Sequence, residues 1–256
     1  MKKSTTTKSK SGSRPKAASG PSSSETSHPD RDCPLCLRLA SFREDNRAAH
    51  PDWFNAPVPQ FGGVDAALLI VGLAPGLQGA NRTGRPFTGD YAGDLLYQTL
   101  LDYGFASGHY EARPDDGLKL VNCRIGNAVH CVPPQNKPTP AEINTCRRFL
   151  IATFEEMPRL RAIVTLGRIS HDSTLKALGL PLRAAPFKHG GEFQHDRVRI
   201  FSSYHCSRYN TNTGVLTPKM FHAVFASVRD YLKDQTGFAF SHASTSAALR
   251  SGGNTG

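Results

Sequence analysis

The chain has 256 residues, a formal net charge of +10 and a hydrophobic share of 38%. This length and composition suit one α/β domain with flanking tails. They exclude a membrane-spanning protein, because no apolar run is long enough to cross a bilayer, and the start lacks the apolar segment of a secretory signal. We therefore expect a cytoplasmic protein. The positive charge favours a polyanionic partner such as nucleic acid about as strongly as it favours a merely solubilising tail.

Residues 1–30 are predicted to form a disordered basic tail. Residues 1–24 carry six Lys and Arg residues and no acidic residue, together with many Ser, Thr and Pro residues. Such a segment buries too little apolar surface to offset the entropy of ordering it. Residues 236–256, rich in Ser, Gly, Thr and Ala, are predicted to form a second disordered tail. This leaves residues 31–235 as the folded domain.

Within this domain, short β-branched and aliphatic runs alternate with helical patterns. Four successive βα units need crossover connections between parallel strands. They predict an α/β fold with three layers, α/β/α, around a four-stranded, mostly parallel central sheet. The predicted strands are 67–72, 119–129, 162–166 and 198–202, and the predicted helices are 92–103, 140–156, 169–178 and 218–233.

Two of these helices have clear start signals. Thr139 is followed by Pro140 and then by Glu142, which is the pattern of an N-cap, a proline at the first helical position and a capping box. Thr217 and Pro218 repeat the first two signals.

The loops after the predicted strands contain the residue types of a binding site. Ligand-binding residues of parallel sheets gather beyond the carboxyl ends of the strands. Here the first loop carries Phe87 and Asp90, the second carries Asn127 and the last carries His205. Each has a common structural role as well: core packing for Phe, a helix N-cap for Asp, a turn for Asn, and a buried hydrogen-bonded His. Their joint placement at one sheet edge predicts a site.

The six cysteines suggest a metal centre or reduced thiols rather than a disulfide framework in a cytoplasmic protein. A C-x2-C pair and a C-x14-C pair offer four thiolates for zinc or an iron–sulfur cluster, and spacing does not separate the two. A redox dithiol is the alternative for the first pair. A zinc nucleobase deaminase is excluded because Asp32 stands where its P-C-x-x-C signature needs proline. Cys123 and Cys206 are expected to be small buried hydrophobic residues. The four predicted ligands are Cys33, Cys36, Cys131 and Cys146.

With these residues assembled, the chain resembles family 5 of the uracil-DNA glycosylase superfamily, a bacterial and archaeal family that carries a [4Fe-4S] cluster. The resemblance covers about residues 31–233. It is carried by the stretches 72–76 and 82–90, by Asn127 to Pro134, by the loop around His205, and by the cysteine pattern. There are two departures. Family 4 enzymes have an acidic residue where Leu73 stands, and proline commonly follows the histidine where this chain has Cys206.

The resemblance implies excision of uracil from single- or double-stranded DNA by hydrolysis of the N-glycosidic bond. Hypoxanthine and other deaminated bases are further expected substrates, and the protein is expected to be a monomer. The rival interpretation is a non-catalytic metal or iron–sulfur protein that binds nucleic acid without releasing a base.

The resemblance also implies residue roles. Asp90 is expected to act as a general base or as an electrostatic stabiliser of the sugar cation, Asn127 to pair with the edge of the base, and His205 to donate a hydrogen bond near O2. Phe87 is expected to stack on the flipped base. The predicted base pocket further includes Gly72, Leu73 and Ala74, and the predicted DNA contacts are Asn81, Arg82, Ser207, Arg208 and Tyr209. The cluster is expected to be structural.

Overall fold

The computed structural model of the chain describes Met1 and residues 26–237. Most of the predicted basic tail and nearly all of the predicted C-terminal tail lie outside these residues. The last part of the basic tail, residues 26–30, is described. In it the Ser27 carbonyl accepts hydrogen bonds from the side chains of Gln60 at 2.6 Å and Thr153 at 3.4 Å. None of the described helices is both long enough and apolar enough to cross a membrane.

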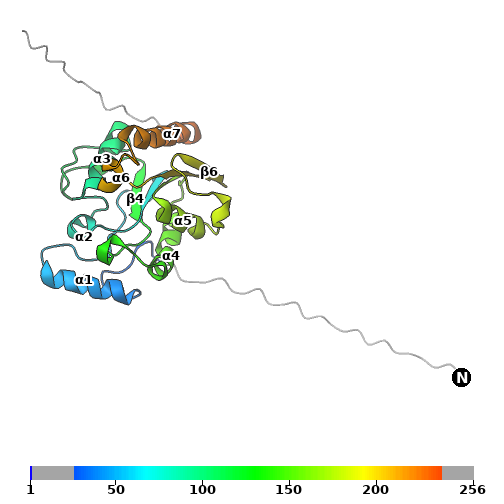
Figure 1. Ribbon diagram of the computed structural model, residues 1–256. Coiled ribbons are helices and arrows are strands. Elements are labelled where there is room, and N and C mark those ends of the chain that lie inside the picture. The colour runs from blue at the N-terminus through cyan, green and yellow to red at the C-terminus, as the bar shows by residue number, and fades with distance from the viewer. Residues whose placement is uncertain (2–25, 238–256) are drawn as a thin grey trace, which may run out of the picture.

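A five-stranded sheet forms the centre of the molecule (Figure 1). Four of its strands are parallel, and the fifth lies antiparallel at one edge. The predicted three-layer α/β/α fold is confirmed, with one strand more than the four predicted. In spatial order the strands are β4 (Cys123–Asn127), β1 (Leu68–Gly72), β5 (Ala162–Leu166), β7 (Val198–Ser203) and β6 (Gly191–His195).

The strand that the sequence did not predict is β6. Its only large apolar residue is Phe193, and its residues alternate between half-buried and exposed. A short edge strand of this kind lacks the continuous apolar run that marks a buried parallel strand.

The predicted strand 119–129 is in fact two strands. Asn122 has a φ of +49°, and its Oδ1 accepts the backbone N–H of Ala67 at 2.8 Å. This left-handed residue turns the chain between β3 (Lys119–Leu120) and β4. β3 pairs instead with β2 (Ala106–Ser107) in a separate two-stranded sheet.

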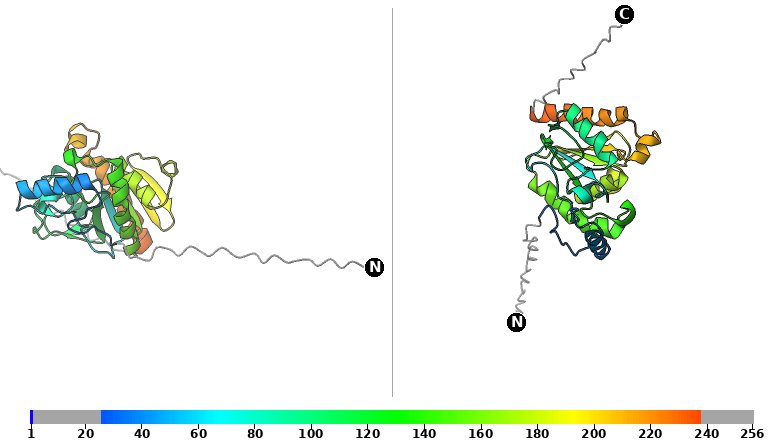
Figure 2. Two further views of the ribbon diagram at one scale, coloured as in Figure 1. Left: turned by 90° about the horizontal axis from the view of Figure 1, so that it is seen from below. Right: turned by 90° about the vertical axis from the view of Figure 1, so that its left-hand side faces the viewer.

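Helices cover both faces of the central sheet (Figure 2). Successive residues of a strand point to opposite faces. In β1, Leu68 and Ile70 belong to the apolar cluster on one face of the sheet, whereas Leu69 and Val71 belong to the cluster on the other face. One face is covered by α3 (Tyr91–Asp102) and α7 (Pro218–Thr236), and the other by α4 (Pro140–Glu156) and α5 (Arg168–Ala177).

The two predicted helix starts are confirmed. The Thr139 hydroxyl accepts the Glu142 N–H at 3.3 Å, and the Glu142 carboxylate accepts the Thr139 N–H at 2.7 Å, which completes a capping box. The Thr217 hydroxyl accepts the Met220 N–H at 3.2 Å.

One long helix, α1 (Leu37–Ala49), was not predicted. Its buried residues are Leu39, Arg43 and Asn46, so its inner face lacks the apolar periodicity that marks a helix in sequence. An ion pair connects α1 to the start of α4, because two nitrogens of Arg38 donate to the Glu142 carboxylate at 2.7 and 2.8 Å. The shorter helices are α2 (Ala80–Thr83), α6 (Arg208–Asn212), η1 (Pro134–Asn136) and η2 (Leu182–Ala184).

Candidate active site

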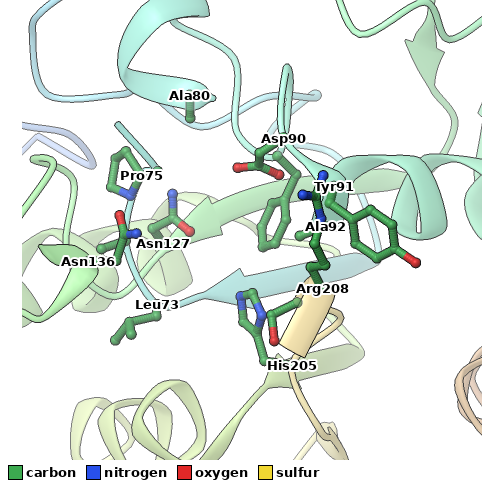
Figure 3. Close-up of a pocket in the computed structure, with 14 residues that line it drawn as sticks. Leu73, Pro75, Ala80, Asp90, Tyr91, Ala92, Asn127, Asn136, His205 and Arg208 are labelled. Atoms are coloured by element: carbon green, nitrogen blue, oxygen red, sulfur yellow. The ribbon is translucent and has the colours of Figure 1, made fainter. Parts of the chain in front are cut away.

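The predicted catalytic residues meet at one edge of the sheet. β1 ends at Gly72, β4 ends at Asn127, and His205 lies two residues beyond β7. A cavity of about 380 Å³ opens there (Figure 3). It is lined by Leu73, Ala74, Pro75, Gly76, Ala80, Phe87, Asp90, Tyr91, Ala92, Asn127, Asn136, His205, Ser207 and Arg208. The three residues predicted to be catalytic, Asp90, Asn127 and His205, therefore line one cavity at the predicted sheet edge.

Asn127 carries an amide whose oxygen is not satisfied within the protein. The residue is 5% exposed, and its Oδ1 is buried with no hydrogen-bond partner among the described residues. Gly72 leaves the room for it, because a Cβ on that residue would collide with this oxygen and with the Phe87 ring. A buried acceptor without a partner costs about 1–3 kcal/mol. A ligand that donates a hydrogen bond would recover this cost.

Asp90 caps a helix with one carboxylate oxygen and lines the cavity as well. As the N-cap of α3 its Oδ1 accepts the Gly93 N–H at 3.3 Å, as the structural interpretation of its sequence position predicted. Burial raises the pKa of this carboxyl, although the N–H groups of Gly93 and Ala92 oppose the shift. Gly79 makes room for the other oxygen, since a Cβ there would collide with it. Among the described residues that line the cavity, only Asp90 has a carboxylate.

His205 faces the same cavity as a neutral imidazole. Burial lowers the pKa of its side chain to about 4, so the ring is uncharged at neutral pH and carries one N–H donor. Its ring lies nearly parallel to that of Phe87, with centroids 6.0 Å apart. The Asn210 amide donates to the His205 carbonyl at 2.8 Å and fixes the loop.

Cys206, which replaces the proline expected after the histidine, fastens this loop to α3. The residue is fully buried, as predicted, and its thiol donates to the Ala92 carbonyl at 3.4 Å. Cys123, the other cysteine predicted to be a small buried residue, is also buried, in β4.

The three remaining pocket residues predicted from sequence lie at the floor and wall of the cavity. Leu73 and Ala74 line it directly, and Gly72 lies under Asn127 and Phe87. Because Leu73 is apolar, this position offers no group to activate water.

Four of the five predicted DNA contacts lie near the rim or on the surface. Ser207 and Arg208 line the cavity at the start of α6, and the Arg208 guanidinium lies 5.2 Å from the centroid of the Tyr91 ring. Tyr209 is 73% exposed, and Arg82 is exposed as well. These side chains are open to a strand of DNA.

Asn81 does not fit the DNA contact predicted for it. It is 1% exposed, and its Nδ2 donates to the Asn55 Oδ1 at 2.9 Å. Its backbone N–H donates to the Gly76 carbonyl at 3.0 Å. The side chain is thus held inside the protein, where it positions the first loop rather than meeting a ligand.

Sequence reasoning missed Asn136 and Tyr91, which also line the cavity. Asn136 ends η1 with a φ of +57°, and Figure 3 shows its amide beside that of Asn127. The available signal was the Pro133-Pro134 pair shortly after Asn127, which marks a loop beyond the strand, and such loops often carry binding residues.

The four cysteines predicted as ligands lie around a second, smaller cavity. All four are free thiols, and Leu39, Val129 and Phe149 complete its apolar wall. The His130 N–H donates to the Cys146 Sγ at 3.4 Å, and an Arg43 nitrogen approaches the Cys131 Sγ at 3.9 Å. Within residues 26–237, however, no group of three or more His, Cys, Asp or Glu side chains is arranged to hold a metal ion.

Comparison with known proteins agrees with this geometry. Residues 59–229 match the family model of the uracil DNA glycosylase superfamily. A type-5 uracil-DNA glycosylase of Thermus thermophilus is 44% identical over 196 residues, which are 74% of this chain and 89% of that protein. Type-5 enzymes of Pyrobaculum aerophilum (39% over 189 residues, 72% and 82%) and Mycobacterium tuberculosis (40% over 206 residues, 77% of each chain) are similar as well.

The family match covers the central sheet and the loops that build the cavity, and three relatives align over most of their length. On these grounds the chain belongs to the uracil DNA glycosylase superfamily.

Proposed function

We propose that this protein excises uracil from DNA by hydrolysing the bond between base and deoxyribose, which leaves an abasic site. The observation that carries the proposal is the buried Asn127 Oδ1, which has no partner among the described residues, in a cavity that Asp90 and His205 also line. The similarity to type-5 uracil-DNA glycosylases supports the same activity.

Asn127 supplies the groups that read the base. Its Oδ1 accepts a hydrogen bond from N3–H of uracil while its amide N–H donates to O4. Cytosine has an acceptor at N3 and a donor at C4, so the same amide orientation meets it acceptor to acceptor. Asn136 adds a second amide beside the first.

His205 and Asp90 act on the two charges that develop as the bond breaks. The departing uracil carries negative charge, which the N–H of the neutral His205 stabilises at O2. The sugar becomes cationic, and the ionised Asp90 carboxylate stabilises it and orients the attacking water. Since Leu73 contributes no acid, this work falls to Asp90 alone among the described residues of the cavity.

The rim and the surface around it bind the DNA. Arg208 and Tyr209 occupy the exposed start of α6, close to where a flipped nucleotide would leave a gap in the duplex, and Arg82 lies nearby as a cation for a phosphate. Phe87 provides the ring on which the extruded base stacks. We further propose that the protein acts as a monomer and tolerates hypoxanthine and other deaminated bases.

The four cysteines fit an iron–sulfur cluster. All four thiols line one cavity, and four Cys thiolates are the ligand set of a [4Fe-4S] cluster. The His130 N–H and the Arg43 guanidinium stabilise thiolate charge. Cys33, Cys36, Cys131 and Cys146 would hold a [4Fe-4S] cluster that cross-links the N-terminal segment, the loop after β4 and α4, and it takes no part in the hydrolysis.

A duplex with one uracil opposite guanine tests the proposal. Purified protein should generate free uracil, detected by mass spectrometry, and an alkali-sensitive site at that position. A matched duplex with thymine should remain intact, and a duplex with hypoxanthine measures the base range. Tight binding to the uracil duplex without base release would instead support the rival interpretation, a non-catalytic nucleic-acid-binding protein.

A further inference from the structure

Phe87 adopts a backbone conformation that its neighbours must hold in place. Its φ is +53°, in the left-handed region that residues with a Cβ rarely adopt. The ring is buried, 7% exposed, between Gly72 and the His205 ring. Relaxation of this conformation would swing the ring away from the cavity, so the contacts of the Phe87 backbone bear on the fit of the base.

Two tyrosine hydroxyls hold this backbone. Tyr97 of α3 donates to the Pro86 carbonyl at 2.6 Å, and Tyr110 donates to the Phe87 carbonyl at 3.2 Å. Gly93 leaves the space where the second bond forms, because a Cβ there would collide with both the Phe87 carbonyl and the Tyr110 hydroxyl. Tyr110 belongs to the loop 108–118 between β2 and β3, which carries none of the motifs of the site.

A buried ion pair locks that loop onto the residues around Phe87. Arg85 donates two hydrogen bonds to the Asp116 carboxylate, at 2.8 and 2.7 Å, and its Nε donates to the Thr88 hydroxyl at 2.7 Å. The Asp116 side chain is fully buried and also accepts the Leu118 N–H at 3.1 Å. The hydrogen bonds from Arg85 hold the pKa of this carboxyl well below its usual value.

Aromatic rings surround the Arg85–Asp116 ion pair and add further contacts. Tyr97 and Tyr110 stack with centroids 4.6 Å apart. The Arg85 guanidinium lies 5.3 Å from the Tyr97 ring, 5.8 Å from the Tyr110 ring and 5.3 Å from the Phe61 ring. Charged hydrogen bonds, cation–π contacts and stacking therefore converge on one side of Phe87.

We propose that Tyr110 and Asp116 are positioning residues that hold Phe87 in its left-handed conformation and thereby set the fit of the base in the pocket. Neither residue lines the cavity, so both act through Phe87. The inference rests on the proposed function, because the fit is read out as uracil release.

Tyr110→Phe removes one hydroxyl and keeps the stacked ring, so it tests the hydrogen bond with little effect on packing. Single-turnover uracil release at saturating enzyme should fall about 2- to 10-fold, the range expected for one hydrogen bond, while affinity for DNA stays unchanged. Asp116→Asn should lower the rate in the same direction. Tyr103→Phe is the matched control, because Tyr103 packs against His222 and Arg229 away from the cavity and should leave the rate unchanged.

A double-mutant cycle separates positioning from general stability. If Tyr110 acts through Phe87, adding Tyr110→Phe to Phe87→Ala should cause no further loss of rate. The same fold-loss in both backgrounds, or no loss in the wild-type background, overturns the inference. Melting temperatures of all variants identify any that fail to fold; Tyr110→Phe should still fold, with a lower melting temperature because the Phe87 carbonyl loses its donor. Failure of the wild-type protein to release uracil overturns both proposals, whereas wild-type release with an uncoupled Tyr110→Phe overturns this one alone.

Discussion

Asn127→Ala is expected to change excision and stability in opposite directions. Most substitutions that lower activity by disturbing a site also lower stability. Here the Oδ1 is a buried acceptor without a partner among the described residues, so the folded protein already bears its desolvation cost of about 1–3 kcal/mol. Its removal should therefore leave the melting temperature equal to or above that of the wild type. The void joins the open cavity beside it, so water can fill it and the loss of packing stays small.

Excision should fall because the reader of the base is lost. A bidentate pair of hydrogen bonds with a base edge contributes about 1–3 kcal/mol of discrimination, which corresponds to roughly 5- to 150-fold in kcat/KM for uracil. Asn127→Asp keeps the shape but places an acceptor opposite O4 of uracil, so its loss should be at least as large. Single-turnover excision assays beside calorimetric melting curves measure the two effects.

Asn55→Ala is the contrasting control. Asn55 is also buried, but its Nδ2 donates to the Asn46 and His50 carbonyls and its Oδ1 accepts from Asn81. Its removal leaves these buried partners without a hydrogen bond and should lower the melting temperature clearly. If Asn127→Ala melted as early as Asn55→Ala and still excised uracil at the wild-type rate, the assignment of Asn127 as the reader of the base would be refuted.

Three further predictions address the other groups. Asp90→Asn keeps the N-cap but should slow base release by about 10²- to 10⁴-fold while DNA affinity is retained. It should also remove the fall in rate at acidic pH, whose midpoint lies above pH 3.8 in the wild type because burial raises the pKa of this carboxyl. An unchanged rate would exclude Asp90 from the chemistry. The pKa of His205 in the folded protein, about 4, lies below the usual 6.5, so the unfolded protein binds more protons and stability should rise from pH 4 to 6.5. His205→Gln should slow excision and reduce this dependence of stability on pH. Calorimetry at several pH values measures it, and an unaltered dependence would contradict the burial of the imidazole. Cys36→Ala combined with Cys146→Ala should abolish iron content and the brown colour of anaerobically prepared protein while Cys123→Ala retains both, and zinc instead of iron in elemental analysis would contradict the cluster.

The sequence predicted the fold because its parallel strands are short runs rich in aliphatic and β-branched residues, most clearly in β1 and β5. All five residues of β1, β4 and β5 are buried, and each of these strands falls within a predicted strand. Once the strands are parallel, their carboxyl ends must lie at one edge, which brings Asn127 and His205 together although 78 positions of sequence numbering separate them. The site follows from topology together with residue type.

What the sequence did not predict depends on contacts between distant segments. α1 buries Arg43, which contacts Cys131 and the Cys33 carbonyl, and Asn46, whose carbonyl accepts a hydrogen bond from Asn55. The hold of Tyr110 and Asp116 on Phe87 spans 23 to 31 residues and joins a hairpin loop to the first motif. No periodicity or local motif encodes such pairings, so they appear only when the chain is folded.

The electrostatics of the cavity differ from those of two ion pairs in the same protein. Asp116 accepts two hydrogen bonds from Arg85, and Glu142 accepts two from Arg38. At the cavity the balance is different, since burial raises the pKa of Asp90, lowers that of His205 and leaves the Asn127 oxygen without a partner among the described residues. The burial of the Asp90 carboxylate and of the Asn127 oxygen destabilises the free protein, whereas the neutral His205 retains an N–H donor at little cost. The three groups match different parts of one ligand: a cationic sugar, an N–H donor and an anionic base oxygen. A nucleotide that is losing uracil supplies all three at once, so the free energy withheld from folding is recovered in the transition state.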